Sequence, residues 1–304
     1  MNKSVNEAAN APIALFVGDV SYDLTMTCSH IPAPDEKVNV DAAIEAPGGV
    51  AANAAVACGL AGALTRLVIA IGDDLAGERL VDELVATGIE VLSSPHPGST
   101  ARVVTLIEPH GEKRLLMYPG VSMYPRRQQI AAMSLQSVNW VHTAVYDIAA
   151  AEYLFDLCRA RGIAWSLDLE PTTFPAGLES LRRVLSGAAT VFCNARAISR
   201  IGAAAVDRLL AMGVRSVVET RGADGAVLHT ASSQCHIAVA AASAVVDTTG
   251  AGDCLAGWFV AERLRGLEPE QALKTAVAAA TISCSRLGTQ SSYPTRDELS
   301  DIAA

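Results

Sequence analysis

Short apolar runs recur along the chain at intervals that leave room for a helix between them. Such runs occur at residues 13–17, 67–71, 138–142, 163–167, 190–193 and 216–219. Continuous apolar runs of this length predict strands that are buried on both faces. Helical patterns separate several of the runs, at 76–87, 150–161, 178–186 and 203–212. This alternation predicts an α/β fold with a doubly wound parallel sheet, and the last part of the chain, 269–286 and 295–302, is predicted to be helical.

The rhythm is interrupted between the second and third of these runs. The segments 101–107 and 114–118 flank Pro109-His110-Gly111-Glu112, which predicts a β-hairpin. Apolar and polar residues alternate over most of residues 38–46, which predicts a further strand. We therefore predict a large α/β domain of residues 12–23, 47–98 and 125–304, and a small β-sheet of residues 24–46 and 99–124. This small sheet could cover a site as a movable element, or it could be a fixed antiparallel extension of the large domain.

Composition and charge narrow the class of protein. The chain has 304 residues, of which 51% are hydrophobic, so it can form a substantial core. Its formal charge is −9 with only four lysines, which argues against nucleic acid or an anionic membrane as the main partner. Seven scattered cysteines predict neither a zinc site nor a disulfide framework. Residues 46–65 carry no charge, but Ala and Gly dominate them, so we expect a buried helix there rather than a membrane span. No signal peptide is evident, and a cytoplasmic location is expected.

A glycine turn late in the chain is the strongest candidate for chemistry. The sequence Val245-Val246-Asp247-Thr248-Thr249-Gly250-Ala251-Gly252-Asp253 passes from a strand-like apolar pair into a turn and then into a helix predicted over 253–265. Gly250 and Gly252 leave the backbone bare, so that N–H groups at the helix N-terminus can surround an anion. Asp253 falls in the first turn, where the helix dipole favours an ionised carboxylate. Helix capping by Asp253 is the simpler explanation of a lone Gly-x-Gly-Asp.

The longer motif is more specific. Asp247-Thr248-Thr249-Gly250-Ala251-Gly252-Asp253 closely resembles the C-terminal signature of the ribokinase (PfkB-type) family of carbohydrate and nucleoside kinases. The resemblance implies that Gly250, Ala251 and Gly252 stabilise charge on the transferred phosphoryl group, and that Asp253 deprotonates the acceptor hydroxyl. It also implies that the small β-sheet is a lid over the sugar. A lid would exclude water, which otherwise competes as acceptor.

A second motif concerns the acceptor. Pro47-Gly48-Gly49-Val50-Ala51-Ala52-Asn53 resembles the family's N-terminal signature, which implies that Gly48, Gly49 and Asn53 contact the substrate. Asp23 follows the first predicted strand, where an α/β sheet has its ligand crevice. On position alone it could equally be a solvated loop residue, but the resemblance implies that it binds sugar hydroxyls. Val50 departs from the lysine that is usual in ribokinases proper, which puts ribose itself in doubt.

Two further segments fit a nucleotide. Thr220, Gly222 and Gly225 are similar to the family's Thr-x-Gly-x-x-Gly element near the phosphates, although a hairpin turn alone would explain them. Asn194 matches the start of the family's Asn-x-x-Glu motif, but Ala197 stands at the Glu position. Mg²⁺ could still arrive held by ATP phosphates. The chain lacks Gly-x4-Gly-Lys-[Ser/Thr] and a Gly-x-Gly-x-x-Gly after the first strand, which argues against P-loop enzymes and dinucleotide dehydrogenases.

These patterns together predict an ATP-dependent kinase. It would transfer the γ-phosphoryl group to a primary hydroxyl of a sugar or sugar derivative, with ATP and Mg²⁺ as cofactors. A nucleoside kinase stays open, as does a sugar-binding regulator weakened in catalysis by Val50 and Ala197. The resemblance further implies a homodimer that pairs its lids. It also implies a monovalent cation, K⁺, at a loop of four residues, namely Asp247, Thr249, Gly288 and Ser292.

Overall fold

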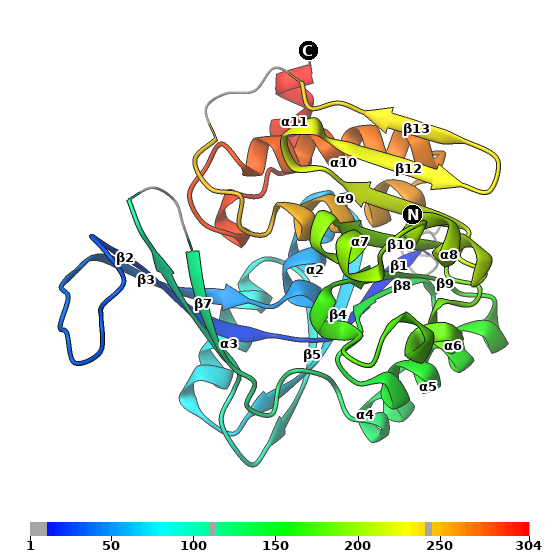
Figure 1. Cartoon of the computed structure of the whole chain (residues 1–304). Coiled ribbons are helices and arrows are strands. Elements are labelled where there is room, and N and C mark those ends of the chain that lie inside the picture. The colour runs from blue at the N-terminus through cyan, green and yellow to red at the C-terminus, as the bar shows by residue number, and fades with distance from the viewer. Residues whose placement is uncertain (1–10, 110–112, 241–244, 304) are drawn as a thin grey trace, which may run out of the picture.

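The computed structural model describes residues 11–109, 113–240 and 245–303. Within these residues the large sheet contains β1 (Ile13–Val17), β4 (Leu64–Gly72), β5 (Glu90–His96), β8 (Val138–Ala144), β9 (Ala164–Leu169), β10 (Thr190–Asn194), β11 (Ser216–Thr220), β12 (Ala226–Thr230) and β13 (Gln234–Ile237). The small sheet contains β2 (Ser21–Cys28), β3 (Val40–Gly48), β6 (Arg102–Ile107) and β7 (Lys113–Tyr118). It projects from one side of the α/β body (Figure 1).

The large sheet is parallel over most of its width. Its order is β13-β12-β11-β10-β9-β8-β1-β4-β5, and the pairs from β5 to β11 are parallel. At the other edge the sheet is extended by two antiparallel strands, β12 and β13, which lie beyond the strands predicted from the sequence. The small sheet has the order β3-β2-β6-β7, with a parallel pair between β2 and β6. The α/β fold with a separate small β-sheet is confirmed.

Helices cover both faces of the large sheet. One face carries α2 (Val50–Leu60), α3 (Leu75–Ala86), α9 (Ala251–Leu264) and α10 (Pro269–Ser283). The other carries α4 (Arg127–Ala132), α5 (Ile148–Arg161), α6 (Arg182–Leu185), α7 (Ala195–Ile201) and α8 (Ala205–Ala211). The chain continues with α11 (Arg296–Ala303), and short 3₁₀ helices lie at Pro171–Thr173, Leu178–Leu181, Gly222–Asp224 and Gln290–Ser292. The two-faced core confirms a doubly wound arrangement.

Small residues bring α2 and α9 into close contact. A Cβ on Gly257 would lie 2.3 Å from the carbonyl oxygen of Ala54, so only glycine lets the two backbones approach this closely. Most of α2 is buried, although it is only 11 residues long. This confirms the buried helix expected within residues 46–65, and no described helix has the length and apolarity to span a bilayer. The packing brings the N-termini of both helices to the same place.

Several local predictions differ from the structure. Val245 and Val246 are exposed and lie outside any strand, because the backbone N–H of Val246 bonds to the carbonyl of Cys284 instead. Strands β5, β12 and β13 and helix α7 were not predicted. Residues 1–10 and part of the predicted hairpin turn (110–112) lie outside the described residues. Because β2 begins at Ser21 and β3 ends at Gly48, strands of the small sheet cross the predicted domain boundaries, which remain a prediction.

Candidate active site

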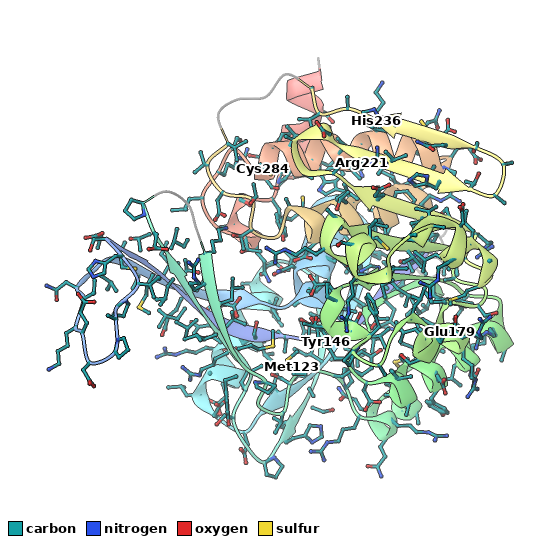
Figure 2. All side chains as sticks on the ribbon, viewed as in Figure 1. Met123, Tyr146, Glu179, Arg221, His236 and Cys284 are labelled. Atoms are coloured by element: carbon teal, nitrogen blue, oxygen red, sulfur yellow. The ribbon has the colours of Figure 1, made fainter. Side chains whose placement is uncertain are left out.

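A cavity of about 420 Å³ lies between the small sheet and the carboxyl ends of the large-sheet strands. Met123 and Tyr146, two of its lining residues, lie where the small sheet meets the α/β body (Figure 2). Its volume is typical of small-molecule sites. Many of the predicted site residues line it, namely Asp23, Gly49, Asn53, Asn194, Thr220, Thr249, Gly250, Gly252 and Asp253. Gly48, Ala251, Gly222, Gly225, Asp247, Gly288 and Ser292 are not among the lining residues.

The glycine turn forms the start of α9. Gly250 has φ 71° and is the residue before the helix, and a Cβ there would lie 2.3 Å from Thr289 Cγ2. Tyr293 donates a hydrogen bond from its hydroxyl to the Gly250 carbonyl at 2.9 Å, which fixes the turn. A Cβ on Gly252 would meet no atom within 4 Å, so this residue faces open space. The first N–H groups of α9 have no partner within the helix and can receive an anion.

Asp253 lies in the first turn of α9, but it does not cap the helix. The capping position belongs to Gly250, which has no side chain to offer, so the capping explanation of Asp253 is wrong. Asn53 donates from Nδ2 to Asp253 Oδ2 at 2.8 Å. Burial and the nearby charge of Asp168 raise the pKa of Asp253 well above its usual range, and the bond from Asn53 opposes the rise only in part. Burial and the neighbouring carboxylates thus disfavour the ionised form, the opposite of the effect that the sequence predicts from the helix dipole.

Further carboxylates meet Asp253 at this cavity. Asp168 is the second-last residue of β9, Glu170 follows that strand, and Asp19 follows β1. The carboxylate of Asp19 accepts hydrogen bonds from the N–H groups of Val50 and Ala51 at 2.8 and 3.1 Å, so it fixes the start of α2. Burial raises the pKa of Asp19 to about 6. Burial and the neighbouring Glu170 raise the pKa of Asp168 well above its usual range.

These additional carboxylates were not predicted from the sequence. The signal that could have found them is their position, because Asp168 and Glu170 come directly at the end of a buried strand. Tyr146, also not predicted, lines the cavity and directs its hydroxyl to Glu170 at 3.5 Å. The cavity is therefore markedly acidic.

Asp23 lies on β2 and faces the cavity from the small sheet. Its Oδ1 is buried and has no hydrogen-bond partner within the described residues. Burial raises its pKa to about 6. A Cβ on Gly48 would lie 2.1 Å from Asp23 Oδ2, so Gly48 makes room for this carboxylate. An unpartnered buried acceptor at a cavity is suited to a ligand hydroxyl.

The predicted nucleotide residues divide into two groups. Asn194 and Thr220 line the cavity, and Asn194 also caps α7 by accepting from the N–H of Ala197 at 2.9 Å. Gly222 and Gly225 lie in the turn that joins β11 to the antiparallel β12. A Cβ on Gly225 would lie 2.1 Å from the carbonyl oxygen of Ile237, so the hairpin itself requires this glycine.

Two of the residues predicted for a monovalent cation, Thr249 and Gly288, contact a third, Asp247. Its carboxylate accepts hydrogen bonds from the N–H groups of Thr249 at 3.0 Å and Gly288 at 3.3 Å. Ser292 is buried and donates to the Thr289 carbonyl. The ammonium group of Lys113, on the small sheet, bonds to Asp247 Oδ1 at 2.9 Å. The ammonium group of Lys113 thus contacts two of the four residues predicted to hold K⁺, Asp247 and Thr249.

Comparison with known proteins identifies the family. Residues 14–296 match the family described as pfkB family carbohydrate kinase. An ATP-dependent ribose-1-phosphate kinase from Halopiger xanaduensis is 26% identical over 93% of this chain and 95% of its own length. A ribokinase from Mus musculus is 27% identical over 95% of this chain and 94% of its own length. The crystal structure of a ribokinase from Thermotoga maritima superposes with a TM-score of 0.81 at 24% identity, covering 96% of this chain and 99% of that one. The predicted class, an ATP-dependent carbohydrate kinase, is confirmed, and the chain belongs to the pfkB family of carbohydrate kinases.

Proposed function

We propose that the protein transfers the γ-phosphoryl group of ATP to a primary hydroxyl of a neutral sugar or sugar derivative. The observation that carries this proposal is the position of Asp253 in the first turn of α9, directly after the Gly250–Gly252 turn, at a cavity that Asp23 and Asn53 also line. A base, an anion hole and a hydroxyl-binding carboxylate thereby share one space. This combination suits phosphoryl transfer to an alcohol.

In this proposal Asp23 accepts hydrogen bonds from acceptor hydroxyls, which satisfies its buried Oδ1. Asp253 takes the proton of the attacking hydroxyl, and its raised pKa makes it a stronger base than an ordinary carboxylate. The N–H groups at the start of α9 face the charge that develops on the transferred phosphoryl group. The small sheet covers the cavity and limits the access of water.

The cavity also has carboxylate oxygens that are suitable ligands for Mg²⁺. Within the described residues, no cluster of three or more His, Cys, Asp or Glu side chains is arranged to hold a metal. Asp168 and Glu170 nevertheless line the cavity close to Asn194, and Mg²⁺ is commonly held by one or two carboxylates together with substrate phosphates. The ion would neutralise charge on the ATP phosphates. We propose that these two carboxylates compensate for the Glu replaced by Ala197.

The charge of the cavity favours a neutral acceptor. Its described lining includes five carboxylates and no Lys, Arg or His; the five are Asp19, Asp23, Asp168, Glu170 and Asp253. A sugar acid or sugar phosphate would bring a further negative charge with no cationic side chain to receive it. Like charges at close range are costly in a site shielded from water. We therefore expect sugar acids and sugar phosphates to be poor acceptors, although a relative is named for ribose-1-phosphate.

A nucleoside acceptor is the second candidate. The small sheet contributes apolar side chains to the cavity wall, including Val103, Leu115 and Met117, and Met123 adds to them. Such a wall could pack against a nucleobase while Asp23 binds ribose hydroxyls. A sugar alone would leave more of this apolar surface uncovered.

An acceptor screen with MgATP tests both candidates. Ribose and fructose represent neutral sugars, adenosine and pseudouridine represent nucleosides, and ribose 1-phosphate and 2-dehydro-3-deoxygluconate represent anionic acceptors. We expect ADP release with members of the first two groups and kcat/KM at least about tenfold lower with the third, equivalent to about 1.4 kcal/mol. Efficient transfer to the anionic acceptors would overturn the charge argument. Tight sugar binding without transfer to any acceptor would instead support a binding regulator.

A further inference from the structure

Lys113 connects the small sheet to the segment that precedes the anion turn. It is the first residue of β7, and its Nζ lies 2.9 Å from Asp247 Oδ1 and 2.5 Å from Thr249 Oγ1. The side chain of Asp247 is only 9% exposed and that of Lys113 is 29% exposed, so water screens this pair less than a surface ion pair. The contact joins residues 134 positions apart in the sequence.

Asp247 organises the backbone around the turn. Its Oδ1 accepts the N–H of Thr249 at 3.0 Å and the Thr249 hydroxyl at 2.7 Å. Its Oδ2 accepts the N–H of Gly288 at 3.3 Å, which draws in the loop after α10. Gly250 is the next residue after Thr249. The Asp247 carboxylate therefore fixes the conformation of the segment from which the anion turn begins. Its position therefore affects the site of phosphoryl transfer.

A carboxylate in this position needs a positive partner. Left uncompensated, it would be a partly buried charge close to the phosphates that the turn is proposed to receive. Burial raises the pKa of Asp247, but the hydrogen bonds from Lys113 and Thr249 outweigh burial and hold the pKa below its usual value. A free monovalent metal ion and an ammonium group carry the same charge and both bind oxygen atoms. The ammonium of Lys113 already occupies the place beside Asp247 and Thr249.

We propose that Lys113 is the built-in cation of the Asp247–Thr249 segment and a positioning residue for the anion turn. It makes the protein independent of free K⁺, and it completes the turn only when the small sheet lies over the cavity. The inference rests on the proposed kinase function for its effect on catalysis. Its effect on cation binding does not depend on that function.

The experiment compares three proteins in the same salt series. Lys113→Met removes the charge and keeps an apolar stem of similar size. Lys37→Met makes the same change at an exposed lysine of the loop between β2 and β3, and it serves as the control. Melting temperatures without ligands, and kcat and KM for MgATP, are measured in KCl, NaCl and choline chloride at equal ionic strength.

We expect the wild type and Lys37→Met to give the same melting temperature and rate in all three salts. Lys113→Met should lose about tenfold in kcat/KM for MgATP in choline chloride, the size expected when one partner of a charged hydrogen bond is removed. KCl should restore much of this loss and raise the melting temperature of that variant alone.

Two results would overturn the proposal. One is a wild-type protein whose melting temperature or rate depends on K⁺, a measurement that needs no variant. The other is a Lys113→Met variant that behaves like the control in every salt. Should no acceptor be phosphorylated, the proposed function fails, but the ligand-free melting temperatures still decide whether Lys113 replaces a free cation.

Discussion

Asn53 donates a hydrogen bond to Asp253 at 2.8 Å and thereby joins the starts of two helices that lie 200 residues apart in the sequence. The Oδ1 of Asn53 accepts a hydrogen bond from Gln290 Nε2 at 2.9 Å. Since Gln290 engages the only acceptor of this amide, the amide group must present its N–H₂ to Asp253. A second side chain thus orients the residue that contacts the proposed base.

The first prediction concerns Gln290. Gln290→Ala leaves the Asn53 amide free to turn, so Asp253 loses a reliably oriented donor that lowers its pKa. We expect kcat to fall about threefold to tenfold, consistent with roughly 1 kcal/mol for one hydrogen bond, and the acid limb of the kcat profile to move to higher pH. Gln128→Ala, at an exposed position on α4, is the control. An unchanged pH profile in Gln290→Ala would contradict this role.

The second prediction concerns Asp23. Asp23→Ala removes a carboxylate at the cavity whose unpartnered Oδ1 is proposed to receive acceptor hydroxyls. Each hydrogen bond to a charged group contributes about 1.5 to 3 kcal/mol, so KM for the acceptor should rise at least about tenfold. KM for MgATP should change little. Steady-state kinetics with each substrate varied in turn measure both values, and an unchanged acceptor KM would show that the acceptor binds elsewhere.

The parts of the site that the sequence revealed are those set by local geometry. Position 250 has a positive φ and no room for a Cβ, so it requires glycine. This local requirement can be recognised from the short motif alone. The buried strands were equally readable, because both of their faces are covered and their sequences are continuously apolar. Strand β5 was missed because it is an edge strand. Its polar residues and Pro95 are tolerated there, while its composition suggests a loop.

Contacts between distant segments could not be predicted in the same way. Lys113 looks like a solvated hairpin residue until the small sheet is placed against Asp247, 134 residues later. The role of Asp168 and Glu170 becomes visible only in the folded sheet, where the end of β9 lies beside Asn194 at the end of β10 and lines the same cavity as Asp19. Asn194 was predicted as a nucleotide contact, and its local role as the cap of α7 was overlooked because α7 itself was not predicted. Capping and ligand contact use the same residue types.

The third prediction concerns pH and stability. Burial raises the pKa of Asp23 from 3.8 to about 6 in the folded protein. Between these values the folded protein keeps a proton that the unfolded chain has released, so the contribution of Asp23 to stability falls as pH rises from about 4 to about 6. Asp23→Asn has no such proton to lose. Without acceptor, we expect its melting temperature to exceed that of the wild type above about pH 6, and the difference to shrink toward about pH 4.

Melting curves of the two proteins across this range measure the effect. Asp19 has a similarly raised pKa, but it is present in both proteins and cancels in the comparison. A difference in melting temperature that does not vary with pH would show that Asp23 has an ordinary pKa in the folded state.

The fourth prediction concerns Asp253. Asp253→Asn keeps the shape of the side chain and can still accept the hydrogen bond from Asn53, but it cannot take the proton of the acceptor hydroxyl. General-base assistance typically contributes about 10² to 10⁴-fold, so kcat should fall by a factor in that range. Both KM values should change little, because Asp23 and the backbone of the turn are expected to supply the binding. The melting temperature should stay the same or rise, since a buried carboxylate is removed. Kinetics measured together with melting separate a catalytic loss from a folding defect, and a fully active Asp253→Asn enzyme would refute the assignment of Asp253 as the base.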